Sequence, residues 1–509
     1  MKNTLSKFLS MFIIPILAIG LFAPGSSATE IISPRIQPIL TYMAAEDPAQ
    51  IVHVIVQKTA ESQGEEAEAQ VAALGGTVTS DLHIINAFAA EMSLQVAMQI
   101  ARSPHVHWVS LDAPMLSTAC TQCVDTNNLA NAYIRAIGVD KVWNNPPYLQ
   151  GKAIGVAVVD SGVNPNGDLY TNMGVNRQVA DVRFNSDYNQ STFDGYGHGT
   201  HVASIVGGDG SESGGKYIGV APMVNIVNVK VSNDDGSAKL NDVVAGLQWV
   251  LENKDAYNIR VVNISLNSAV AESYHTSPLD AAVEILWFNK IVVVASAGNK
   301  GNGAIYPPAN DPFIITVGAT DDKGTNSISD DIVASFSAYG STSDGVIKPD
   351  LVAPGANIIA RLVNQNMGLA NAHPSNKVGD QYFRMSGTSM AAPMVSAAVA
   401  ILLQDEPNLT PDQVKYRLMA TANKSWSGYN ATKSGAGYLD IYAAVYGTTT
   451  KSANTGIKAS QLLSTGSAPI TWNSVGWNSV GWNSVGWNSV GWNSVGWNSV
   501  GWNSDYWGP

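Results

Sequence analysis

The sequence places an aspartate, a histidine and a serine in three segments that suit nucleophilic catalysis. Asp160 ends the apolar run of residues 153–159, His198 stands between two glycines, and Ser389 begins an alanine-rich segment of helical character. A serine hydroxyl becomes a strong nucleophile when a histidine accepts its proton and a carboxylate holds the imidazole. The three residues therefore predict acyl transfer, with Ser389 as the nucleophile, His198 as the general acid and base, and Asp160 as the group that orients the histidine.

A fourth segment supplies a donor for the negative charge of such a reaction. Ala297, Gly298 and Asn299 close a predicted strand, and the side chain of Asn299 carries an amide N–H. The backbone N–H of Ser389 lies at the start of its predicted helix, where the helix dipole favours negative charge. We expect these two groups to bind the oxyanion of the tetrahedral intermediate.

The remaining histidines carry no comparable motif. His201 lies one helical turn after His198, but this H-x-x-H pattern lacks the glutamate and the spacing of the H-E-x-x-H zinc motif. We therefore predict that His201 packs inside the fold, and we assign no metal ligand. Acyl transfer itself requires no metal ion or other cofactor.

The middle of the chain has the pattern of an α/β domain. From about residue 127 to residue 447, short apolar runs alternate with helical segments, which indicates a parallel sheet covered by helices. The expected strands include residues 153–159, 224–231, 261–264 and 291–295. Asp160 then lies at the carboxyl end of a parallel strand, where α/β sheets place their sites.

The N-terminus has the composition of a signal peptide. Lys2 and Lys7 precede an apolar stretch from Phe8 to Ala23, and small residues follow as far as Ala28. The stretch is shorter than the roughly 20 residues of a membrane-spanning helix. Residues 1–28 are therefore predicted to direct export and to be removed, so that the protein is secreted.

A small unit follows the predicted signal peptide. A strand at residues 51–56, a helix at residues 65–74, and a second strand, helix and strand between residues 83 and 109 predict a βαββαβ-like arrangement. This is a small α+β fold of the ferredoxin-like kind, and such a unit can fold alone.

The two cysteines, Cys120 and Cys123, form a C-x-x-C pair between the small unit and the α/β domain. Three roles fit this spacing: a local disulfide, half of a zinc site, or a redox pair. No second cluster of Cys and His completes four zinc ligands, and no βαβ pattern surrounds the pair. In an exported protein a disulfide is the preferred interpretation.

The C-terminal region changes in composition and then becomes repetitive. Residues 448–471 are rich in threonine and serine, also contain glycine and lysine, and are predicted to be a linker. Residues 472–509 contain the repeated pentapeptide W-N-S-V-G. A period of five residues matches neither a helical stripe nor a one-sided strand. Two interpretations stay open: a low-complexity tail without a specific ligand, or a module that binds a surface or associates with itself through its indole rings.

The charge balance excludes one class of partner. The net charge is -12, and no run of lysine or arginine could contact phosphates. Nucleic-acid binding is therefore not expected, and the acidic excess favours solubility.

Several motifs resemble the subtilisin family of serine proteases, whose triad has the same order of Asp, His and Ser. The matching stretches are residues 197–203, 219–222, 334–337, 348–355, 385–393 and 435–439. The similarity covers about residues 125–447 and is strongest toward the branch of the major intracellular serine protease. It implies a subtilisin-like α/β/α catalytic domain at residues 126–447 that hydrolyses proteins and peptides. The predicted signal peptide is a difference from an intracellular relative. We expect the signal peptide to decide the location of the protein, which is then exported.

The small unit resembles the subtilisin propeptide, because residues 84–88 and 106–109 match two of its strands. The resemblance implies a propeptide at residues 29–125, with its core at about residues 50–112. It also implies that the propeptide assists folding, inhibits the enzyme by placing its C-terminal end in the cleft, and is cut by the enzyme near residues 112–125. The protein is thus expected to be an autoprocessed zymogen that has its own propeptide as an intramolecular inhibitor.

The resemblance also assigns residues that bind substrate. In the family the peptide adds as a strand between two enzyme segments, which here match Gly236-Ser237-Ala238 and Ser265-Leu266-Asn267. Ala297 and Gly298 complete the site. Asn267 replaces the usual glycine of the pocket wall and Ile305 falls on the pocket floor, so a narrow pocket is expected.

Two further expectations come from the family. The first is a cis peptide bond between Tyr306 and Pro307. The second concerns structural calcium, which many relatives bind: residues 209–216 do not reproduce the family's calcium loop, so calcium ligands stay unassigned.

The C-terminal tail also fits a function of another class. The tryptophan-rich tail is compatible with a protease scaffold that has lost activity and serves mainly in surface binding or assembly. The complete set of Asp160, His198, Ser389 and Asn299 argues for the enzyme.

Overall fold

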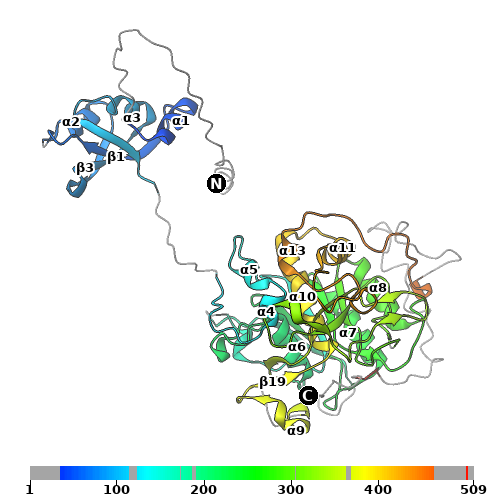
Figure 1. Ribbon diagram of the computed structural model, residues 1–509. Helices are drawn as coiled ribbons and strands as arrows, with labels where there is room; N and C mark the ends of the chain where they lie inside the picture. The colour runs from blue at the N-terminus through cyan, green and yellow to red at the C-terminus, as the bar shows by residue number, and fades with distance from the viewer. Residues whose placement is uncertain are drawn as a thin grey trace. The chain divides into compact units, whose positions relative to one another are not determined.

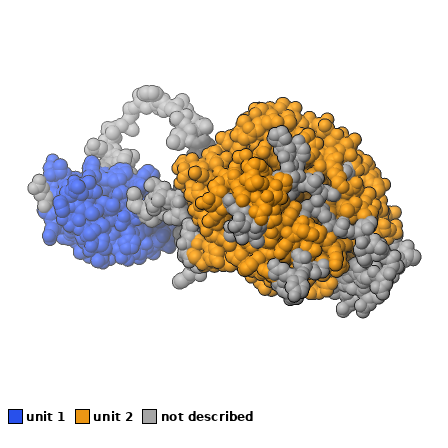
Figure 2. Space-filling view, turned by 90° about the horizontal axis from the view of Figure 1, so that it is seen from below, with its two compact units in different colours: residues 1–120 blue, residues 121–509 orange. Residues whose placement is uncertain are grey.

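The computed structural model describes residues 35–62, 64–113, 123–171, 174–185, 191–303, 305–362, 368–463 and 500–501. The chain divides into two compact units, residues 1–120 and 121–509, which Figure 2 colours separately. The predicted signal peptide and most of the repeats lie outside the described residues.

The first unit is built on a four-stranded antiparallel sheet in the order β2-β3-β1-β4. Its elements after residue 50 are β1 (Ile51–Lys58), α2 (Glu66–Ala73), β2 (Thr77–Leu82), η1 (His83–Ile85), β3 (Ala87–Ser93), α3 (Leu94–Ile100) and β4 (Val106–Leu111). Val52, Val54 and Val56 alternate along β1 and are buried in a core that belongs to this unit, as the two-residue period of a strand requires. The elements predicted from the sequence are present, and β2 is a further strand that completes the βαββαβ order.

A helix precedes the predicted core of this unit. α1 (Pro38–Glu46) has a proline in its first turn, where the missing N–H costs no helical hydrogen bond. Leu40 and the preceding Ile36 are buried in the same core, and Ile36 pairs with Val109. The core therefore begins before residue 50. The sequence analysis missed this helix, although Leu40, Met43 and Ala44 recur at helical spacing and pack on the core of this unit.

The second unit contains a mostly parallel sheet in the order β13-β12-β11-β9-β5-β7-β6, with β16 also paired to β12. Its strands are β5 (Gly155–Asp160), β6 (Gln178–Arg183), β7 (Asn225–Lys230), β9 (Ile259–Ile264), β11 (Val292–Ser296), β12 (Ile315–Asp321), β13 (Ile332–Val333) and β16 (Leu351–Pro354). Among these pairs, β12 and β13 run antiparallel and the others run parallel. The α/β fold with a parallel sheet is confirmed.

Helices cover this sheet (Figure 1). α6 (His198–Gly207) and α10 (Thr388–Asp405) contact each other and the sheet, and α7 (Leu240–Asn253) and α8 (Pro278–Phe288) form a second helical pair against it. From β5 the order of strands leads to β7 and β6 on one side and to β9 and β11 on the other. Asp160 therefore ends a strand at a switch point of the sheet, where such folds bind ligands.

α10 is also the one helix in the described residues that is long and apolar enough to cross a membrane. Because 89% of it is buried inside the fold, its hydropathy reflects a core position. The smaller helices of this unit are α4 (Tyr133–Ala136), α5 (Val139–Trp143), α9 (Gly368–Ala372), α11 (Pro411–Thr421), α12 (Ala431–Ser434) and α13 (Ile441–Val445).

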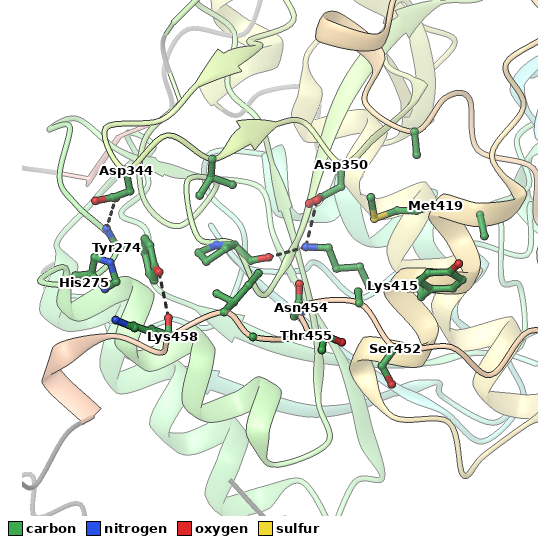
Figure 3. Close-up of a pocket in the computed structure, with 18 of the residues that line it drawn as sticks. Tyr274, His275, Asp344, Asp350, Lys415, Met419, Ser452, Asn454, Thr455 and Lys458 are labelled. Carbon is green, nitrogen blue, oxygen red and sulfur yellow. Dashed lines mark hydrogen bonds and ion pairs between the residues drawn. The ribbon is translucent and has the colours of Figure 1, made fainter. Parts of the chain in front are cut away.

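The predicted linker is wrong for residues 448–463, because these residues pack on the second unit. Arg417 donates to the carbonyl of Thr449 at 3.0 Å, and Tyr274 donates to the carbonyl of Lys458 at 3.1 Å. Residues 452–458 line one side of a pocket of about 900 Å³ (Figure 3). Side-chain hydrogen bonds to its backbone carbonyls, together with the buried Ala459 and Leu463, hold the segment in place. At the other end of the unit, Val124 exchanges two hydrogen bonds with the side chain of Asn144, so the unit begins before the predicted residue 126.

The ammonium group of Lys415 lies in a cage of oxygen atoms beside this pocket, and Figure 3 shows its contact with Asp350. It donates to the carbonyls of Pro312, Phe313 and Ile314 at 2.7, 3.3 and 2.9 Å, and it lies 3.1 Å from a carboxylate oxygen of Asp350. Lys415 is almost fully buried, so removal of its ammonium group would leave buried oxygen atoms without this donor.

We predict that Lys415→Met lowers the free energy of unfolding by about 3 kcal/mol, which is the lower end of the range for removing one partner of a buried ion pair. The lower end is expected because Lys348 still pairs with Asp350. Urea unfolding of the protein with Ser389 replaced by alanine, which prevents self-digestion, measures the change. The matched control is Lys424→Met at an exposed position of the same pocket, where we expect less than about 0.5 kcal/mol. Equal effects of the two substitutions would contradict the cage.

Three carboxyl groups lie buried together under α8. Burial is the main cause that raises the pKa of Asp280, of Glu284 and of Asp311, the last to about 6, and their mutual repulsion raises the pKa of Asp280 and Glu284 further. Since the folded pKa values exceed the unfolded ones, the cluster favours the folded state at low pH, and this contribution is lost as the pH rises through the raised pKa values of the three groups, of which that of Asp311 is about 6.

Glu284→Gln is therefore expected to raise the melting temperature at pH 8 by a few degrees and to have a smaller effect at pH 5. Glutamine keeps the acceptor that the N–H of Ser460 uses at 2.8 Å, and it removes the charge. Thermal unfolding at the two pH values, again with Ser389 replaced by alanine, measures this. Glu252→Gln at an exposed position of α7 serves as the control without pH dependence. A lower melting temperature for Glu284→Gln at pH 8 would show that the charge is not a burden there.

Candidate active site

The predicted aspartate and histidine meet in the interior of the second unit. Both oxygens of Asp160, at the end of β5, lie within hydrogen-bond reach of Nδ1 of His198, at 2.9 and 3.0 Å, and both side chains are fully buried. The carboxylate fixes the ring, so that in the neutral histidine Nδ1 carries the proton and Nε2 is the base. Gly199 allows this approach, since a Cβ there would lie 2.1 Å from the carbonyl oxygen of Gly162.

A second buried aspartate, which the sequence analysis did not single out, supports this pair. Asp194 accepts hydrogen bonds from Ser161 Oγ at 2.8 Å, from the N–H of Gly197 at 2.7 Å and from Thr200 N–H and Oγ at 2.8 and 2.7 Å. Burial raises the pKa of Asp194, while these hydrogen bonds act to lower it. The carboxylate ties the loop before α6 to the end of β5, and thus fixes the distance between the two catalytic candidates.

The predicted serine lies in the first turn of α10. Ser389 Oγ donates to the carbonyl of Ser265 at 3.1 Å, and Ser265 Oγ donates to the carbonyl of Ser389 at 3.1 Å. The second bond is available because Pro393, four residues later in the helix, has no N–H for the carbonyl of Ser389. To act as a nucleophile, the hydroxyl must turn its proton from the Ser265 carbonyl to His198 Nε2.

The amide of Asn299 is oriented by the residue before Ser389. Its Oδ1 accepts from the N–H and the Oγ of Thr388 at 2.9 and 3.0 Å, so Nδ2 faces the opposite way. A Cβ built on Gly387 would lie 3.2 Å from Asn299 Nδ2 and 3.7 Å from the N of Ser389. The nitrogen atoms of the two predicted oxyanion donors therefore lie within 4 Å of one point beside Gly387, and Thr388 is a positioning residue that the sequence analysis missed.

The two predicted substrate segments are edge strands of one small sheet. Gly236 precedes β8 (Ser237–Ala238) in a turn with φ of 85°, and Ser265 and the buried Leu266 precede β10 (Asn267–Ser268). β8 and β10 do not pair with each other: β20 (Val500–Gly501), from the C-terminal repeats, lies between them.

The predicted wall and floor residues of the pocket are also buried. Asn267 donates from Nδ2 to the carbonyl of Ser296 at 2.9 Å. Ile305 and Ala297 belong to one small apolar cluster with Ala309 and Ala338. Gly298, with φ of 106°, joins this cluster to Asn299.

The predicted cis bond between Tyr306 and Pro307 is wrong, because the cis bond here joins Pro307 to Pro308. Both bonds precede a proline, and both are therefore able to adopt the cis form. The prediction followed the Tyr-Pro pair and chose the bond one residue too early.

The remaining predictions of this site concern His201 and metal ligands. Nε2 of the buried His201 lies 3.0 Å from the carbonyl of Phe383, and burial lowers the pKa of His201 to about 3, so it is a neutral packing residue as predicted. Within the described ranges, no group of three or more His, Cys, Asp or Glu could hold a metal ion. In the loop of residues 209–216, Asp209 accepts from the N–H of Ser211 at 2.9 Å and Glu212 pairs with Arg361.

Cys123 is disulfide-bonded, in agreement with the preferred interpretation of the C-x-x-C pair. The second cysteine of the sequence, Cys120, lies outside the described residues.

Comparison with known proteins gives a consistent result. Residues 151–439 match the sequence pattern of the subtilase family, described as peptidase S8. Serine protease AprX of Bacillus subtilis is 40% identical over 316 residues, which cover 60% of this chain and 69% of AprX. Subtilisin Savinase of Lederbergia lenta is 31% identical over 296 residues, covering 58% and 92% of the two chains. Fervidolysin from Fervidobacterium pennivorans, described as a keratinolytic enzyme related to subtilisin, has a solved structure with a TM-score of 0.48 and 23% identity, over 79% of this chain and 61% of its own.

Proposed function

Because the chain belongs to the subtilase family and is a subtilisin-like serine endopeptidase, we propose that it is secreted, matures by cutting its own precursor, and uses Asp160, His198 and Ser389 as its triad. The observation that carries the proposal is the buried contact between Asp160 and His198, together with the position of Ser389 in the first turn of α10, a helix that packs on α6. Casein hydrolysis by the purified protein, measured before and after phenylmethylsulfonyl fluoride, tests it. Loss of hydrolysis supports the triad, and an inert protein would instead favour a binding scaffold.

The chemistry follows from the contacts of these groups. Ser389 Oγ attacks the substrate carbonyl carbon and gives its proton to His198 Nε2, while Asp160 stabilises the imidazolium through Nδ1. The carbonyl oxygen becomes an oxyanion, which Asn299 Nδ2 and the N–H of Ser389 bind. His198 then protonates the leaving amine, and the C–N bond breaks to leave an acyl-enzyme. Water, deprotonated by His198, hydrolyses the ester and restores Ser389.

Two features support export and self-processing. The N-terminal sequence has the features of a signal peptide, and a disulfide at Cys123 suits an oxidising compartment. The first unit has a hydrophobic core of its own, as a propeptide that folds as a unit requires. Because Val124 is already bonded to Asn144 in the second unit, we place the propeptide cut N-terminal to Cys123, within the predicted range of residues 112–125.

The primary pocket is predicted to prefer Leu, Met or Ala over Phe or Tyr at the residue before the cut. Asn267 and Ile305 are both buried where the family resemblance places the pocket, and both are larger than the small residues expected there. Lys300, whose Nζ lies 5.4 Å from the ring centre of Tyr306, adds positive charge that disfavours Lys and Arg. A peptide-library profile of the mature enzyme measures the preference.

The matched variant for this prediction is Asn267→Gly. It should raise the rate of cleavage after Phe, relative to cleavage after Leu, about tenfold, which is the lower end of the range for a change of pocket volume. A wild-type profile dominated by Phe, Tyr, Lys or Arg would contradict the narrow pocket.

A further inference from the structure

The C-terminal repeats contribute a strand to the groove in which the substrate is proposed to bind. β20 lies between β8 and β10 and runs antiparallel to both: Val500 faces Ala238 and Ser268, and Gly501 faces Ser237 and Asn267. β8 and β10 overlap the two segments that the family resemblance assigned to the substrate, at Ser237, Ala238 and Asn267. A strand from the same chain thus occupies the position of a bound peptide, in the manner of strand addition.

The direction of this strand points toward the proposed nucleophile. Because β20 and β10 are antiparallel, the step from Val500 to Gly501 runs alongside the step from Ser268 to Asn267. Continued along β10, that direction leads to Ser265, whose carbonyl accepts the hydroxyl of Ser389 at 3.1 Å. A peptide cannot pair with the backbone of both β8 and β10 while β20 holds those positions.

The repeat sequence suits this role. Val-Gly occurs six times at intervals of five residues, from Val475 to Val500, so each copy offers the same two-residue backbone. No charged residue lies between Lys458 and Asp505, so a copy enters the groove without burying a charge. Val500 is 37 residues beyond Leu463, the end of the packed segment, and even the first copy at Val475, 12 residues beyond it, has a maximum reach of roughly 40 Å.

We propose that the pentapeptide repeats are an intramolecular competitor of the substrate, held in the groove between β8 and β10 of the mature enzyme. This inference rests on the proposed function, because it takes these strands as the substrate site. A tethered segment at an effective concentration of about 1 mM, with an intrinsic Kd of about 0.1 mM, leaves roughly a tenth of the groove open. The tail then raises KM about tenfold and leaves kcat unchanged, because the enzyme that has bound substrate is free of the tail.

The test compares three forms of the full-length precursor after maturation: wild type and two variants of the repeats. One variant carries Val475→Pro, Val480→Pro, Val485→Pro, Val490→Pro, Val495→Pro and Val500→Pro. Proline has no N–H to donate and is not tolerated in a central strand. The matched control has threonine at the same six positions, which keeps the N–H and a high strand propensity. Hydrolysis of Ala-Ala-Pro-Leu p-nitroanilide gives kcat and KM, and intact mass confirms that the repeats are present.

We expect the proline variant to have a KM about tenfold lower than the wild type and the threonine control, at equal kcat. Added peptide WNSVGWNSVG should inhibit the proline variant competitively. Equal KM values in all three forms, or a mature wild type that lacks the repeats, would overturn the proposal while the protease assignment stands. Absence of hydrolysis sensitive to phenylmethylsulfonyl fluoride in all three would contradict the proposed function, and this inference with it.

Discussion

Ser389→Ala is expected to leave the precursor uncut and to abolish peptidase activity. The substitution removes the Oγ that attacks the substrate, and the loss should be about a millionfold in kcat, the scale known from removal of the nucleophile in a subtilisin. The fold should survive, because alanine adds no bulk and the carbonyl of Ser389 keeps its bond from Ser265. Intact mass of the secreted protein should show a chain that begins near Thr29 and retains the first unit.

The control for this experiment is Ser375→Ala, at an exposed serine of the same unit. It should mature like the wild type, whose N-terminus is expected ahead of Cys123. If purified Ser389→Ala matures at the same site and rate without added protease, self-processing by Ser389 is refuted. If it also still cleaves casein, the triad assignment fails as well.

Asn299→Ala should lower kcat by about 100- to 1,000-fold with little change in KM. The Asn299 amide is proposed to bind charge that develops only in the transition state, so its loss affects the barrier more than substrate binding. The magnitude is the one known from removal of an oxyanion donor in a subtilisin. Steady-state kinetics of mature protein on a chromogenic peptide separate the two constants.

Thr388 provides a graded control for this prediction. Thr388→Val removes the hydroxyl that donates to Asn299 Oδ1 at 3.0 Å but keeps the backbone donor at 2.9 Å, so a smaller loss of kcat is expected, about tenfold. Thr388→Ser restores the hydroxyl and should recover the rate. A kcat for Asn299→Ala within threefold of the wild type would remove Asn299 from the oxyanion site.

The sequence was sufficient for the parts of the site that depend on strand and helix ends. Asp160 ends a continuous apolar run that a buried parallel strand requires, and Ser389 lies in the first turn of a helix rich in small residues, so both positions could be predicted from local patterns. The contacts that align these residues could not be predicted in this way. Asp194 and Thr388 form hydrogen bonds to residues that belong to another motif or to a distant part of the sequence. A polar residue in a loop has no sequence pattern that reveals such a partner.

The boundaries of the units show the same limit. Residues 448–463 have the composition of a linker, yet they pack through hydrogen bonds to Arg417 and Tyr274, which composition does not report. The strand at Val500-Gly501 was not predictable from its pentapeptide, because its extended form is set by pairing with β8 and β10 and not by its own side-chain period.

Chemical labelling of the mature enzyme tests the central assignment most directly. Phenylmethylsulfonyl fluoride sulfonylates an activated serine, and peptide mass mapping locates the modified residue. We expect one modified residue, Ser389, and its labelling should rise in step with the loss of casein hydrolysis. In the Asn299→Ala variant, labelling of Ser389 should fall only as far as the activity falls. Full inhibition with Ser389 unmodified, or with the label on another serine such as Ser265, would contradict the triad.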